Sequence, residues 1–237
     1  MKQGRTGGSA IVGVPPRAAS EIFGERLSLA QKYAELLATT GIEHGLLGPH
    51  EAPKIWDRHI VNCAIVESLL PHRTRVIDIG SGAGLPGLVL AIARPDLRVT
   101  LVEPLARRTA WLEVAVQEIG LSNVTVQRAR AEAMVGLIQG QVVTARAVAR
   151  LDKLAAWAWP LLPDGGRLFA LKVRSAEQEL AETLPQITAQ GLAHAEVHSL
   201  GADLLSEPVR VIEMVRSARP SPSRAASDTP RKKRRRR

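Results

Sequence analysis

The sequence predicts an α/β fold with a doubly wound, mostly parallel sheet, and three observations support this. From residue 72 onward, short apolar segments typical of strands alternate with longer segments that have helical periodicity. The last two strand segments have no helix between them, so we expect them to form an antiparallel hairpin. A glycine-rich turn follows the first strand, where open parallel sheets bind ligands.

A helical extension should precede the sheet. Residues 18–40 carry apolar side chains at helical spacing, and Gly41 is placed to end this helix. A second helix is expected over residues 51–70, with Pro53 in its first turn and Pro71 after its end.

The remaining elements follow in alternation. Runs rich in Val, Ile and Leu predict strands at 75–79, 98–102, 124–127, 142–145, 167–172, 193–200 and 209–215. Amphipathic stretches predict helices at 86–94, 106–119, 131–138, 151–161 and 176–189.

Length and composition fit one domain with flexible ends. The chain has 237 residues, which suits a single domain over 18–216, and residues 1–17 and 217–237 have the composition of disordered segments. The sequence has neither an apolar run of membrane-spanning length nor a secretory signal. Its single cysteine, Cys63, suits a reducing, cytoplasmic setting.

Positive charge is concentrated at the C-terminus. The formal net charge is +9, and the last seven residues, RKKRRRR, carry seven of these charges, which leaves +2 for the rest. Such a tail favours attraction to nucleic acid by counterion release. A solvated tail that only aids solubility is the alternative.

The glycine turn, Gly80-Ser81-Gly82-Ala83-Gly84, should form the floor of a ligand site, because glycine lets the backbone approach a ligand closely. Its spacing up to Gly87 also fits a dinucleotide fingerprint, so the glycines alone leave two cofactor classes open.

Two carboxylates refine this choice. Asp78, just before the turn, would repel a diphosphate but favour a sulfonium and an α-amino group, as in S-adenosyl-L-methionine. Glu103, which follows the second strand, can accept both ribose hydroxyls in either cofactor class. With the expected hairpin added to it, the predicted parallel sheet also resembles the seven-stranded, Rossmann-like sheet of class I S-adenosylmethionine-dependent methyltransferases.

A more specific resemblance covers residues 18–216. The segments VIDIGSGAGLPGLVLAIARPDLRVTLVEPLARRTAWLE, NVTVQRARAE, VVTARAVARLDKL, IWDRHIVNC and PDGGRLFALK resemble the bacterial 16S rRNA guanine-N7 methyltransferases (RsmG/GidB type). Glu103 stands where this family often has Asp, and Val173 follows Lys172 where it usually has Gly. The resemblance implies a transferase that methylates N7 of a guanine in 16S small-subunit rRNA.

The resemblance also implies roles for individual residues. Gly80, Gly82, Gly84 and Leu85 would line the methionine and ribose part of the cofactor, and Glu103 would bind the ribose. Ala131 and Glu132 would border the adenine, and Arg146 would lie near the methyl donor.

Substrate contacts are less defined. Arg58, His59 and Lys172 are candidates for contacting RNA, and no residue is firmly assigned as catalytic, with Arg146 the candidate near the guanine. Nucleophilic attack by a ring nitrogen needs no general base, because no proton must leave first. The implied partner is 16S rRNA or the small ribosomal subunit. We expect a monomer without a metal site and without membrane contact.

Other functions stay open at this point. They are a methyltransferase acting on another RNA or a small molecule, a nicotinamide-dependent oxidoreductase that uses the same glycines, and an inactive RNA-binding module that kept the fold.

Overall fold

The computed structural model describes residues 12–172 and 176–218, and within them the strands form one seven-stranded sheet. The strand order is β3-β2-β1-β4-β5-β7-β6. The strands are β1 Arg75–Ile79, β2 Arg98–Val102, β3 Val124–Gln127, β4 Val142–Arg146, β5 Arg167–Lys172, β6 Leu192–Leu200 and β7 Val209–Arg216. The first five run parallel, and β7 pairs antiparallel with both β5 and β6, which confirms the expected hairpin.

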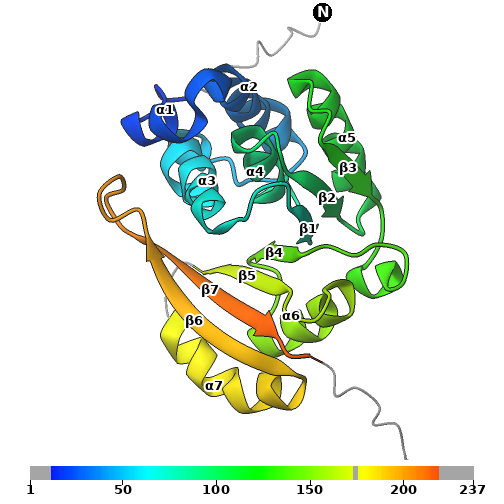
Figure 1. The fold of residues 1–237 in the computed structure, drawn as a ribbon. Coiled ribbons are helices and arrows are strands. Elements are labelled where there is room, and N and C mark those ends of the chain that lie inside the picture. Colours follow the sequence, from blue (N-terminus) through cyan, green and yellow to red (C-terminus); the bar gives the residue numbers. More distant parts are fainter. Residues whose placement is uncertain (1–11, 173–175, 219–237) are drawn as a thin grey trace, which may run out of the picture.

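Helices cover both faces of this sheet (Figure 1). One face carries the N-terminal helices together with α4 (Gly87–Ala93) and α5 (Ala106–Ile119). The other carries α6 (Leu151–Ala158), its 3₁₀ continuation η7 (Trp159–Leu161), and α7 (Ala176–Ala189). Alternate strand residues enter different cores: Val76 packs in the first cluster and Ile77 in the second. Burial on both faces explains the continuous apolar character of the parallel strands.

The N-terminal extension departs from the predicted helix over 18–40. It consists of α1 (Arg17–Phe23), η1 (Gly24–Arg26), α2 (Leu27–Leu36) and a π-helical end, η2 (Leu37–Gly41). Gly24 has φ +50°, a left-handed conformation that ends α1 and turns the chain.

The last helical element of this extension, η2, ends at Gly41 as predicted, and the capping residue Ile42 still has helical backbone angles. A Cβ at Gly41 would lie 3.2 Å from the Leu36 carbonyl oxygen and in ordinary contact, at 3.6 Å, with the Trp111 ring. Residues 12–16 were expected to be disordered, yet the Trp56 indole donates to the Gly13 carbonyl at 2.8 Å. The rest of that expected segment, residues 1–11, lies outside the described residues.

The second helical stretch, predicted over 51–70, is helical but irregular. It runs through η3 (Ala52–Lys54), η4 (Ile55–Val61), α3 (Asn62–Ala64) and η5 (Ile65–Leu69). The helix predicted over 131–138 is shortened to the 3₁₀ turn η6 (Ala131–Met134), because Gly136 adopts φ +80° soon afterwards.

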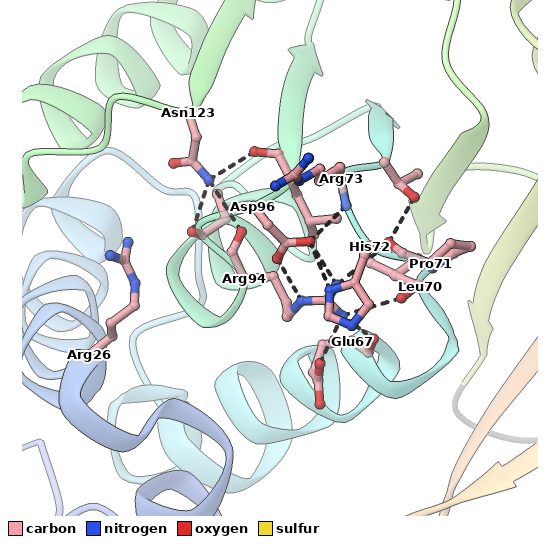
Figure 2. A network of polar contacts seen from close by, with 12 residues as sticks. Arg26, Glu67, Leu70, Pro71, His72, Arg73, Arg94, Asp96 and Asn123 are labelled. Atoms are coloured by element: carbon pink, nitrogen blue, oxygen red, sulfur yellow. Dashed lines mark hydrogen bonds and ion pairs between the residues drawn. The ribbon is translucent and has the colours of Figure 1, made fainter.

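Arg94 joins the helical extension to the sheet (Figure 2). It lies just after α4 and donates to the carbonyls of Glu67 and Leu70, at the end of η5. It also pairs with the carboxylates of Glu67 at 3.2 Å and Asp96 at 2.8 Å. The guanidinium thus connects the end of the second helical stretch to the turn that leads into β2.

Candidate active site

A cavity of about 680 Å³ lies at the carboxyl ends of the parallel strands, where the strand order reverses between β1 and β4. Four strand-to-helix connections line it, together with residues of the helical extension. The lining residues include Ile79 to Ala83 and Leu85 after β1, Val102 to Leu105 and Arg108 after β2, Ala129 to Glu132 after β3, Arg146 to Val148 after β4, and Leu46, Leu47, His59 and Trp157.

The glycine turn after β1 forms the floor of this cavity. Gly80 and Gly82 have φ of +65° and +56°, in the left-handed region that disfavours other residues. A Cβ built on Gly82 would have no described protein atom closer than 3.8 Å, so it would project into open space. A Cβ on Gly84 would instead meet Leu88 at 2.4 Å. Gly82 therefore leaves room for a ligand, and Gly84 leaves room for α4.

The helical extension supports this turn from below. Tyr33 of α2 is fully buried, and its hydroxyl donates to the Ala83 carbonyl at 2.7 Å. Burial raises the pKa of this phenol well above its ordinary value, so the hydroxyl stays protonated as a donor. No sequence pattern links these two residues, because 50 positions separate them.

Asp78 lies beneath the turn, whereas the sequence predicted that its carboxylate would lie beside the sulfonium and α-amino group of a cofactor. The side chain is fully buried and, among the described residues, does not contribute to the cavity lining. Its oxygens accept hydrogen bonds from the Thr144 hydroxyl at 2.9 Å and the Gly87 amide at 3.2 Å. Burial raises the pKa of this carboxyl to about 7. Asp78 thus ties β1 to β4 and to the start of α4.

Glu103 lies at the cavity wall and links two of its loops. One carboxylate oxygen accepts from the Gly82 amide and the other from the Leu105 amide, both at 3.0 Å. A carboxylate has about four acceptor positions, so it can accept further hydrogen bonds from a ligand. The residue is 1 % exposed, which makes these bonds part of a preorganised wall.

The remaining predicted cofactor residues surround the same space. Gly80 and Leu85 line the cavity, and Ala131 and Glu132 border it at η6. Ala131 is buried, and the Glu132 side chain is exposed. Trp157, which was not predicted as a cofactor contact, lies on α6 and lines the cavity while packing against the second core cluster.

Arg146, the last residue of β4, is held by the second helical stretch. Its guanidinium donates to the Cys63 sulfur at 3.2 Å, to the Arg58 carbonyl at 3.2 Å and to His59 Nδ1 at 2.9 Å. The next residue, Ala147, has φ +54°, an uncommon conformation for alanine that turns the chain along the cavity.

His59 is fixed in one tautomer by this arrangement. Its Nδ1 accepts from Arg146, so Nε2 carries the proton and donates to the Glu51 carboxylate at 2.8 Å. Burial, followed by the charge of Arg146, lowers the pKa of His59 below its ordinary value, so the ring is neutral at neutral pH. The hydrogen bond from His59 lowers the pKa of Glu51, against the opposing effect of burial.

The predicted substrate residues occupy different places. His59 lines the main cavity, and Arg58 lines a second, adjacent cavity. Lys172 ends β5, while the following Val173 lies outside the described residues. Cys63 is buried, as expected for a small thiol in the core.

The fold is that of class I S-adenosylmethionine-dependent methyltransferases, and solved structures with this fold match it at low sequence identity. An S-adenosylmethionine-dependent O-methyltransferase from Thermotoga maritima matches with a TM-score of 0.55 and 16 % identity, over 80 % of this chain and 72 % of its own. A tRNA (m1A58) methyltransferase from Aquifex aeolicus matches with a TM-score of 0.51 and 12 % identity, over 67 % and 68 % of the two chains.

Sequence comparison identifies the family. The family described as rRNA small subunit methyltransferase G (GidB) matches residues 26–207. A relative named ribosomal RNA small subunit methyltransferase G from Salinispora tropica is 52 % identical over 231 residues, covering 91 % of this chain and 96 % of the relative. A relative of the same name from Thermobifida fusca is 50 % identical over 221 residues, covering 92 % and 93 %. The chain therefore belongs to the rRNA small subunit methyltransferase G family.

Within 12–172 and 176–218, no group of three or more His, Cys, Asp or Glu side chains is arranged to hold a metal ion. In the same ranges, no helix combines the length and the apolar character needed to cross a membrane.

Proposed function

We propose that this chain transfers a methyl group from S-adenosylmethionine to N7 of a guanine in 16S rRNA. The observation that carries this proposal is the geometry of Glu103 and Gly82 at the switch point of the sheet. Glu103 is bound to two loop amides yet borders the cavity, and the turn facing it is free of side-chain atoms at Gly82. Membership of the family supports the choice of rRNA as substrate.

The residues present fit this cofactor. Glu103 would accept the ribose hydroxyls, and Ala131 and Glu132 would border the adenine. The backbone at Gly80, Gly82 and Leu85 would lie along the methionine portion. Gly84 and Asp78 would act beneath the turn, by allowing α4 to pack closely and by holding the Gly87 amide.

When bound, S-adenosylmethionine would supply an activated methyl group on a sulfonium. The N7 lone pair would form the new bond to the methyl carbon as the methyl–sulfur bond breaks. The electron pair of the broken bond would stay on sulfur. No proton leaves N7 before attack, so the chain's task is to align the two reactants and exclude water. Arg146 and the residues that fix it would orient the guanine, and Arg58, His59 and Lys172 would contact the RNA.

The reaction would occur in the cytoplasm, on 16S rRNA or on the assembled small subunit, with the protein acting as a monomer. Loss of positive charge from sulfur and its gain by guanine leave the total charge unchanged. An arginine near the site therefore need not oppose the reaction, provided that it lies beside an oxygen acceptor rather than beside N7.

Three measurements test the proposal. Calorimetry should detect binding of S-adenosylhomocysteine and none of NADH, which separates a methyltransferase from a nicotinamide enzyme. The protein should transfer tritiated methyl groups to small subunits from a strain that lacks the enzyme. After mild reductive cleavage of the methylated rRNA, reverse transcription should then stop at one guanine. Label in a small molecule instead of rRNA would contradict the choice of substrate.

A further inference from the structure

A second cavity, of about 360 Å³, adjoins the first one and is not needed for the cofactor. It shares Leu46, Leu47, His59, Arg146 and Ala147 with the first cavity, so the two spaces lie on either side of a common wall. Gly48 and Arg58 also line it and are exposed, so it is open to solvent. Its volume is near the lower end of the roughly 300–1,000 Å³ typical of small-molecule sites.

The polar lining of this cavity contains one carboxylate, Glu51, and two guanidinium groups, Arg58 and Arg146. Glu51 is bound by Arg58 at 3.2 Å through one oxygen and by His59 at 2.8 Å through the other. Its side chain is 20 % exposed, so its remaining acceptor positions are accessible. The contacts of Arg146 among the described residues use three of its five N–H groups, which leaves two for a ligand.

Apolar side chains complete the lining. Leu46 and Leu47 come from the loop between the two helical stretches, and Leu171 comes from β5. Leucine side chains can cover the two faces of a planar ring, as apolar residues do for a nucleotide turned out of its stack. A flat ring with donors on one edge and an acceptor beside them fits this combination of groups.

We propose that the second cavity is the acceptor site, in which Glu51 receives the N1–H and N2 amino hydrogens of the target guanine while Arg146 donates to its O6. This inference rests on the proposed function, because it assigns the substrate base to the space beside the proposed cofactor site. It makes Glu51 a specificity-determining residue, which neither its sequence position nor its neighbours in the chain indicate.

The same geometry explains why adenine would be rejected. Adenine also has an N7 lone pair, so chemistry at that atom does not distinguish the two purines. Its Watson–Crick edge presents an acceptor at N1, which would face the Glu51 carboxylate without a hydrogen between them. Two acceptors that face each other in the occupied site, with no hydrogen between them, are costly, and a site built for one hydrogen-bonding pattern discriminates strongly against another. The carboxylate would also favour the positive charge gained by the methylated guanine.

The test compares Glu51→Gln with wild type on small subunits assembled on 16S rRNA with either guanine or adenine at the mapped target. We expect kcat/KM for guanine to fall by about 5- to 150-fold, the range for loss of a bidentate base contact. Glutamine offers one donor and one acceptor and so pairs with the edge of adenine. The variant should therefore show a higher ratio of adenine to guanine methylation, with its affinity for S-adenosylhomocysteine unchanged.

Controls separate this inference from its alternatives. Asp57→Asn removes an exposed carboxylate from the same helical stretch and should leave both substrates unaffected. If Glu51 only supports His59 and Arg146, Glu51→Gln would lower transfer to both bases equally, and that result would overturn the inference. Unchanged transfer to guanine would overturn it too. Failure of the wild-type protein to methylate rRNA, or to bind S-adenosylhomocysteine, would instead reject the proposed function.

Discussion

Glu103 couples two loops at the level of single atoms. Its carboxylate accepts the Gly82 and Leu105 amides, so the turn after β1 and the start of the segment after β2 are held in register. Asp78 has a comparable role one layer deeper, between β4 and α4. The two acids that the sequence analysis treated as ligand contacts therefore differ: one borders the cavity, and the other is part of its foundation.

Gly82→Ala should weaken binding of S-adenosylhomocysteine by about tenfold or more, since overfilling a packed site costs about 1–3 kcal/mol. The added methyl would project into the open space beside the turn. The left-handed backbone at this position should also lower the free energy of unfolding by about 1–2 kcal/mol. Calorimetry and urea denaturation measure the two effects separately.

Gly120→Ala is the matched control for this variant. Gly120 ends α5 with φ +82°, and a Cβ there would meet no described atom within 4 Å. It should show a similar loss of stability with normal ligand affinity. Equal loss of affinity in both variants would mean that backbone strain, and not the filled space, is responsible.

The pH dependence of transfer should reflect His59. This ring is neutral at neutral pH, and its lowered pKa places protonation below the ordinary value of about 6.5. As pH falls through that lowered pKa, Nδ1 stops accepting from Arg146, and the imidazolium then faces the Arg146 guanidinium, with the Glu51 carboxylate on its other side. We therefore expect kcat/KM to fall on the acid side.

His59→Asn should flatten this acid limb, because an asparagine oxygen can take the place of Nδ1 as an acceptor that does not titrate in this range. His194→Asn, an exposed histidine on the edge strand β6, is the control and should keep the limb. An acid limb that persists unchanged in His59→Asn would assign the titration to another group.

At the scale of elements, the helical extension forms part of the site. Tyr33 of α2 holds the glycine turn, and the stretch from η3 to α3 supplies Glu51, His59 and Cys63 around Arg146. The extension is in turn fixed to the sheet by Arg94 at the opposite ends of the strands (Figure 2). Loss of that attachment should therefore lower the free energy of unfolding more than it changes the cavity.

Arg94→Ala should lower the free energy of unfolding by about 2–3 kcal/mol. This is less than the roughly 3–5 kcal/mol for breaking a fully buried ion pair, because the Arg94 side chain is 15 % exposed. The loss leaves the Glu67 and Leu70 carbonyls without this donor. Urea unfolding measures it, and Arg98→Ala, an exposed arginine at the start of β2, should change little.

The ion pair between Arg94 and Asp96 should also make the free energy of unfolding depend on pH in the acid range. Arg94 holds the pKa of Asp96 well below its ordinary value. The folded state is therefore stabilised above the unfolded pKa of about 3.9, and this contribution is lost as pH falls toward the lowered pKa. Arg94→Ala should lose less stability than wild type between neutral pH and pH of about 3. An identical acid slope in both proteins would rule out this pair as the source.

At the scale of the whole molecule, the basic C-terminal run should add to the affinity for RNA. The run RKKRRRR occupies 231–237, outside the described residues. Deleting it should make the plot of the logarithm of the rRNA binding constant against the logarithm of salt concentration less steep, by up to about 5. This value follows from seven positive charges that each contribute about 0.7 on single-stranded RNA. Affinity should fall at low salt, while single-turnover transfer at saturating subunit should stay unchanged. A slope that does not change would identify the tail as a solubility element.

The order of strands and helices could be read from the chain, because each apolar run and each amphipathic stretch is a local pattern. The turn from Gly80 to Gly84 and the position of Glu103 could be predicted for the same reason. The break at Gly24 and the short η6 could not, since they depend on the left-handed backbone of Gly24 and Gly136.

Local pattern was thus enough for the α/β class, the antiparallel hairpin and the position of the glycine turn. Tertiary structure alone decided that Asp78 faces inward, that Tyr33 holds the turn, and that Glu51, His59 and Arg146 form one chain of hydrogen bonds beside a second cavity. The physical reason is sequence separation. Periodicity reports which face of an element is buried, but partners that lie 50 or 87 residues apart are chosen by how the elements pack.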